Sequence, residues 1–208
     1  APFKKCLDQF AQAFQEMRRQ AAQGVPIDPD DLKITTLALS QPIWHYGLRH
    51  ADWLFAQKPE NAPKVGFFAL SKILDGSERA ECQREDELGR FARAIPLYLA
   101  EAAHYWSDYA THCYFMVVEG GGPVVSGGET DGNTLFDIVP SEMRYFVTGE
   151  IGSSGEGDAT QWQIFLSLWE CSTRTKLACE SDSATQGEFG TILLALEKRL
   201  LTRIGLKR

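Results

Sequence analysis

The hydrophobic pattern is clearest in the last third of the chain, where it predicts three strands and a helix. RYFVTGEI, WQIFLSLWE and TKLACES are apolar segments separated by Gly-rich or short polar links, as in an antiparallel meander. Both sides of the middle segment are largely apolar, which predicts a central strand covered on two faces. The run EFGTILLALEKRLLTRIG then carries apolar residues at helical spacing. We therefore expect an amphipathic helix packed on a meander.

The middle of the chain predicts two further strands around a helix. Residues 64–74 and 113–118 are short, apolar and aromatic, as buried strands are. Residues 94–110 carry an apolar stripe at helical spacing, and Pro96 suits an early position in that helix. Together with the meander, this order predicts an α/β domain over residues 61–208, with a mixed sheet flanked by helices.

The N-terminal 60 residues predict a helical extension. Six apolar residues recur at steps of four and three, namely Phe3, Leu7, Phe10, Phe14, Met17 and Ala21. Such a heptad-like seam favours a helix that pairs with a neighbour, and a homo-oligomer through this helix is one possibility. A similar stepping continues at Leu37, Trp44, Leu48, Ala51 and Phe55, which predicts a second helix from Gln41 onwards. For residues 33–39 a short strand stays open, because three of them are β-branched.

Charge and cysteine content narrow the class of protein. The formal net charge of the 208 residues is −7, and no basic patch is concentrated enough for a nucleic-acid interface. Five scattered cysteines without a CxxC pair favour reduced thiols. No apolar run is long enough to span a membrane, and no signal peptide is visible. We expect a cytoplasmic protein, or a periplasmic one if a signal peptide was removed.

Two groups of residues are candidates for catalysis. His45, His50 and Asp52 lie close in sequence, but two histidines five residues apart do not share a helical face as zinc ligands at i and i+4 do. His104 and Cys113 supply a base and a thiol, although Cys113 opens an apolar strand. Neither group forms a recognisable catalytic pattern. The sequence therefore predicts no enzyme, no metal and no cofactor, with a small hydrolase or ligand-binding enzyme as the alternative.

The aromatic residues near position 50 are the best candidates for a binding surface. Trp44, Tyr46, His50 and Trp53 fall on a predicted helix that can present one face outward. Exposed aromatic residues are enriched at protein contacts. We predict that these four side chains bind a protein partner.

Residues 64–208 resemble the N-terminal domain of TolB and its relatives, with the motifs in the final third and the strand, helix and strand of residues 64–118 fitting the preceding half. The resemblance rests on a V-x-G-x-[IV] strand, a strand closing in L-x-[DE] and a strand opening on Leu, here Val147, Gly149, Ile151, Leu168, Glu170, Thr175, Lys176 and Leu177. It implies a three-layer α/β fold with a mixed sheet of about five strands. It also implies a non-catalytic bacterial interaction or scaffold domain, in an envelope-associated or larger multidomain assembly.

Overall fold

The computed structural model describes residues 33–48, 50, 52–73, 87–118, 123–128, 131–155 and 160–205. Residues 34–208 form one compact unit, and residues 1–33 are assigned to another. The predicted N-terminal seam, and the oligomer proposed through it, lie outside the described residues. Residues 34–60, which the sequence placed in the helical extension, belong to the same unit as the sheet.

A mixed sheet of eight strands organises the fold, where about five were expected. The strands are β1 (Ile34–Leu39), β2 (Lys64–Phe68), β3 (Ser71–Lys72), β4 (Ala110–Val118), β5 (Pro123–Val124), β6 (Met143–Ser154), β7 (Gln161–Glu170) and β8 (Thr175–Thr185). Their main order is β1-β4-β2-β6-β7-β8, with β3 beside β6 and β5 beside β4. β2 is parallel to β4 and β6, whereas β1 and β4, β6 and β7, and β7 and β8 are antiparallel. The predicted meander is thus confirmed.

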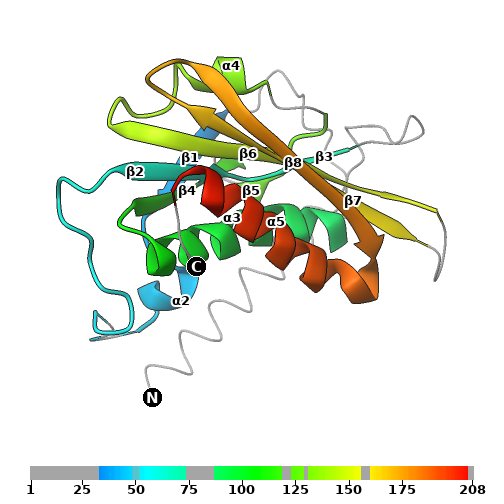
Figure 1. Ribbon diagram of the computed structural model, residues 1–208, viewed down its shortest axis with the longest axis horizontal. Helices are drawn as coiled ribbons and strands as arrows, with labels where there is room; N and C mark the ends of the chain where they lie inside the picture. The colour runs from blue at the N-terminus through cyan, green and yellow to red at the C-terminus, as the bar shows by residue number, and fades with distance from the viewer. Residues whose placement is uncertain are drawn as a thin grey trace. The chain divides into compact units, whose positions relative to one another are not determined.

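Two long helices pack on one face of this sheet (Figure 1). α3 (Glu87–Trp106) contributes residues such as Ile95 and Leu99, and α5 (Phe189–Arg203) contributes Leu196 and Leu200. All four side chains belong to one core with the helix-facing residues of β2, β4, β6 and β7. The amphipathic patterns of both helices explain this packing, because each has one apolar stripe to bury.

The opposite face of the sheet does not carry the helix layer that a three-layer fold would place there, as far as the described residues show. It contacts the segment that contains the short helix α4 (Gly132–Leu135), which lies across the sheet from α3 and α5 (Figure 1). Leu135, Phe146 and Trp169 form a second, smaller core there. The fit is close, since a Cβ atom on Gly132 would lie 2.2 Å from the indole of Trp169. Within the described residues, this face therefore carries a local cover and no long helix.

β7 is an interior strand of the sheet, as the alternation of its side chains between two largely apolar faces predicted. It lies between β6 and β8, and its helix-facing side chains are all buried: Trp162, Ile164, Leu166 and Leu168. On the other face Gln163, Phe165 and Ser167 are only half-buried. The strand is thus central in the sheet, with one face packed more completely than the other.

Pro96 lies inside α3, and not at its beginning as predicted. Proline has no N–H, so the carbonyl oxygen of Ala92 loses its usual partner four residues ahead. The backbone N–H of Leu70, just after β2, donates to that oxygen at 2.9 Å. The proline therefore links the helix to the strand connection beneath it.

The second predicted helix, from Gln41 onwards, is wrong. Of the residues described between 41 and 58, only α2 (Ile43–Tyr46) is helical, and bends and turns follow it. Residues 34–39 adopt the strand alternative as β1, antiparallel to β4. Tertiary pairing with β4 decides this, because β-branched residues suit a strand and the apolar spacing alone is compatible with either structure.

Candidate protein-contact site

Residues 42–55, called the aromatic segment below, are held against the C-terminal end of α3. Phe55 is its buried anchor, and the imidazole of His104 stacks on it with ring centroids 3.6 Å apart. His104 Nε2–H donates to the carbonyl oxygen of Ala56 at 2.9 Å, since a carbonyl can only accept. The hydroxyl of Tyr105 donates to the carbonyl of Leu54 at 2.6 Å. Successive helix residues thus fix both sides of Phe55.

Two neighbouring rings complete this anchor. Trp44 meets Phe55 edge-on, and its Nε1–H donates to Glu101 Oε2 at 3.3 Å. His45 also packs against Phe55 and is buried. Its Nε2 lies 3.9 Å from Asp52 Oδ1 and has no hydrogen-bond partner among the described residues. The first turn of the segment is therefore fastened to α3 through Trp44.

Other apolar side chains of the segment face solvent. Trp53 is 79% exposed, and Ile43, Tyr46 and Leu48 are also exposed. Tyr46 is held in place by its hydroxyl oxygen, which accepts the backbone N–H of Ser40 at 3.3 Å. Tryptophan and tyrosine are enriched among the hot spots of protein interfaces, which makes this segment a candidate contact site.

The four predicted partner-binding residues therefore differ in their surroundings. Tyr46, His50 and Trp53 are exposed, whereas Trp44 is half-buried and holds the segment to Glu101. His50 has a φ of +60°, the left-handed conformation, which places it in a turn and not on a helix. Sequence reasoning missed Ile43 and Tyr105, because the fold that joins their elements is not local.

The catalytic alternatives gain no support from this geometry. Cys113 is buried, and its thiol donates to the carbonyl of Pro96 at 3.2 Å. Burial raises the pKa of that thiol above its ordinary value, which disfavours the nucleophilic thiolate. Desolvation, assisted by the charge of Lys58, lowers the pKa of His104 to about 4. His104 and Cys113 are thus each committed to a backbone carbonyl of a different segment.

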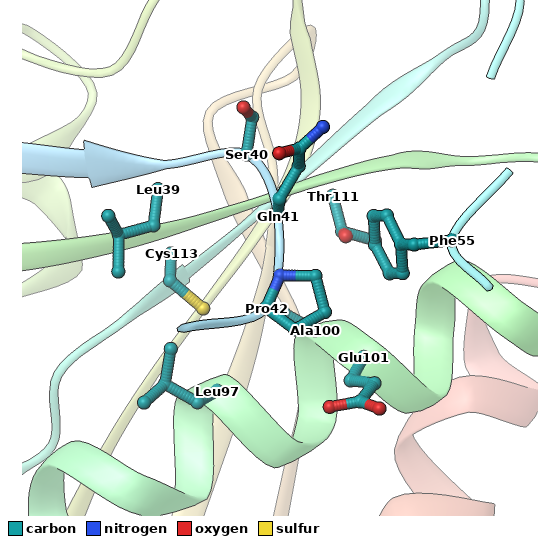
Figure 2. Close-up of a pocket in the computed structure, with 10 residues that line it drawn as sticks. All are labelled: Leu39, Ser40, Gln41, Pro42, Phe55, Leu97, Ala100, Glu101, Thr111 and Cys113. Carbon is teal, nitrogen blue, oxygen red and sulfur yellow. The ribbon is translucent and has the colours of Figure 1, made fainter. Parts of the chain in front are cut away.

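The cavity beside Cys113 is too small for a substrate. Figure 2 shows the side chains around it, which come from the end of β1, from α3, from β4 and from Phe55. Its volume is about 10 Å³, room for about one water molecule. It is best explained as a packing defect between α3 and the chain leaving β1.

A larger hollow lies at the other face, between the segment after α4 and the turn joining β7 to β8. Its volume is about 240 Å³, below the usual size of small-molecule sites. Arg144 and Arg174 line it, and Arg174 is paired with Asp137 at 2.8 Å. No acid-base pair with a catalytic arrangement lies among its lining residues.

The described residues offer neither a metal site nor a membrane-spanning helix. Among these residues, no group of three or more His, Cys, Asp or Glu side chains is placed to hold a metal ion. Nor is any of their helices long and apolar enough to cross a membrane. The expected compartment, cytoplasmic or periplasmic, stays a prediction.

Comparison with known proteins finds similarity only among solved structures. No protein-family model and no curated protein matches the chain. The PelC dodecamer from Paraburkholderia phytofirmans is similar over 85% of this chain and 100% of its own, with 10% identity and a TM-score of 0.42. TolB from Acinetobacter baumannii is similar over 84% of this chain and 31% of its own, with 9% identity and a TM-score of 0.42. Lipoprotein GNA1162 from Neisseria meningitidis covers 65% of this chain, with 12% identity and a TM-score of 0.32.

TolB is thus among the solved structures to which the chain is similar. The likeness is distant, and TM-scores of this size do not assign the chain to a family. The mixed α/β architecture rests on the sheet and helices described above.

Proposed function

We propose that this protein is a non-catalytic bacterial interaction or scaffold domain that binds a protein partner through its aromatic segment. The observation that supports this most strongly is the exposure of Trp53, at 79%, on a segment that Phe55 anchors in the core. Tryptophan is the residue type most often found as a binding hot spot. The proposed contact centres on Trp53 and includes Tyr46 and His50.

Pre-organisation adds to this argument. Binding costs less conformational entropy when the contact residues are already held in place. Here the stacking of His104 on Phe55, and the hydrogen bonds from His104 and Tyr105 to backbone carbonyls, hold the segment without covering Trp53. We expect a partner to gain the burial of the indole without having to order the backbone beneath it.

The second part of the proposal is that the protein belongs to an envelope-associated or larger multidomain assembly. It is supported by the TolB-like strand motifs, which the sequence carries at Val147, Gly149 and Ile151. Fractionation of the source cells, with detection of the native protein, tests it. Recovery of the protein only as a free species of its own mass contradicts this part, and leaves the contact at Trp53 to be tested separately.

Site-specific photocrosslinking tests the contact itself. A photoreactive phenylalanine replaces Trp53 in the full chain inside the source cells, and Leu194 on α5 is replaced in the same way as the control, because it is also exposed. We expect one dominant adduct from position 53 that is absent from position 194. Trp53→Ala should then reduce capture of the identified partner at least about tenfold, as for a hot-spot residue.

Two results would reject the proposal. Equal adducts from positions 53 and 194 would show that the aromatic segment has no special role. Turnover of a small molecule that is lost on a single substitution in a pocket would instead favour the hydrolase alternative with His45, His50 and Asp52, or His104 and Cys113.

A further inference from the structure

Among the described residues, β1 is an edge strand that lacks the usual protection against pairing. It pairs with β4 on one side, and it pairs with no other described strand. Its sequence, ITTLAL, has no charge and no proline, and five of its six residues are exposed. Ile34 is 55% exposed and Leu37 is 46% exposed, and they lie on opposite faces of the sheet. A neutral, apolar edge of this kind is a template for pairing with another strand.

β8, at the other edge of the sheet, is protected in the usual way. Glu180 and Asp182 point to the helix side, where Arg199 of α5 pairs with them at 3.1 and 3.2 Å. Arg203 adds a third ion pair, to Glu180 at 3.4 Å. Inward-pointing charges and a covering helix are two of the devices that keep edge strands from pairing. The two edges therefore differ in how readily they accept a strand.

We propose that β1 pairs antiparallel with β1 of a second copy of this chain, joining two sheets across a twofold axis. An axis perpendicular to the sheet keeps equivalent faces on the same side. Two residues that lie opposite each other across the axis must then have residue numbers that differ by an even number, because side chains alternate between the two faces of a strand. A register centred on Leu37 satisfies this rule and places each Leu37 opposite its equivalent.

The uncharged edge of β1, which matches itself in this register, favours a second copy as the occupant, although the chain as a whole is acidic. The chain has a net charge of −7, so two copies repel each other over most of their surface. Residues 34–42 contain no charged side chain, and in this register Thr35 lies opposite Leu39 and Thr36 opposite Ala38. Cross-strand pairs of this kind are favourable or neutral, with no like charges opposed. This inference is independent of the contact proposed at Trp53.

Sedimentation of the full chain tests the dimer. A contact through one strand is small, so we expect a dissociation constant in the micromolar range or weaker and a concentration-dependent mass. Leu37→Lys should leave a monomer, because a lysine on the edge blocks strand pairing. Leu177→Lys is the matched control on β8, where Leu177 is 45% exposed, and it should leave the dimer unchanged.

A cysteine variant tests the register without relying on loss of association. In a chain with Cys6, Cys82, Cys171 and Cys179 changed to Ser, Leu37→Cys should form an intermolecular disulfide on mild oxidation. Thr35→Cys should not, because the two equivalent residues would lie four positions apart along the strands, roughly 13 Å, beyond the reach of a disulfide.

Four outcomes would overturn the inference. They are a wild-type chain that stays monomeric at every concentration, a dimer that survives Leu37→Lys, a dimer that Leu177→Lys also abolishes, and crosslinking that is equal at positions 35 and 37. A dimer lost in Phe10→Lys but kept in Leu37→Lys would place the contact at the N-terminal seam instead. Thermal unfolding of each variant shows whether a lost dimer reflects a lost fold.

Discussion

Acid should destabilise this protein through His104, and the structure gives both the sign and the size of the effect. Burial against Phe55 lowers the pKa of His104 from 6.5 to about 4, and the nearby charge of Lys58 acts in the same direction. Above pH 6.5 the imidazole is neutral in the folded and unfolded chains alike. Between pH 6.5 and about 4 only the unfolded chain binds the proton, so stability falls as the pH falls.

The magnitude follows from the two pKa values. Each pH unit within this window should lower the free energy of unfolding by about 1.4 kcal/mol, and the total loss should reach up to about 3 kcal/mol. Urea unfolding followed by tryptophan fluorescence, repeated at several pH values, measures this slope. Carboxyl groups of proteins also titrate near the acid end of this pH window. The pH dependence must therefore be compared with that of a variant that lacks only the imidazole.

His104→Phe is that variant. It keeps an aromatic ring to stack on Phe55, but it cannot bind a proton or donate to the carbonyl of Ala56. We expect lower stability than the parent at pH 7 and a shallower dependence between pH 6.5 and 4.5. An NMR titration of the imidazole gives the pKa of His104 directly. Parallel pH profiles for the two proteins, or a titration midpoint near 6.5, would refute the reasoning.

Three further substitutions test the packing on both faces of the sheet. Gly132→Ala should lower the free energy of unfolding by about 3 kcal/mol, because the new methyl group overlaps the indole of Trp169. Urea unfolding measures this loss, and unchanged stability would show that the cover over this face is loose. Gly190→Ala is its control, since nothing lies within 4 Å of a Cβ there, and it should be neutral or slightly stabilising. Tyr98→Phe should lower the free energy of unfolding by about 1–3 kcal/mol in the same assay, because the tyrosine hydroxyl donates to the buried side chain of Glu197. Equal stability of the variant and the parent would mean that Glu197 does not need this donor.

Some of this fold was predictable because its signals are local. The alternation in residues 162–168 reflects a strand whose side chains point to opposite faces, and the helical spacing in residues 189–204 reflects one apolar stripe. Both patterns record a periodicity of the backbone itself. The meander and its closing helix were therefore predicted correctly from the residues that form them.

The aromatic segment shows what local patterns do not contain. Trp44 and Trp53 have the same chemistry and lie on the same predicted helix, yet one is fastened to Glu101 and the other is free. Glu101 is 57 positions away from Trp44, so no spacing within the segment indicates the hydrogen bond. A turn at His50 then separates the two tryptophans.

By itself, the sequence determined the kinds of the longer elements in residues 61–208, namely the helices α3 and α5 and the strands of the meander, but not the short β3, β5 and α4. Only the tertiary structure decided that residues 34–39 form an edge strand, that both long helices share one face, and which of the aromatic side chains remain exposed. The physical reason is that burial is a property of contacts between distant segments. A residue's own neighbours in sequence set its backbone preference, but the packing of the whole unit sets which surface is left for a partner.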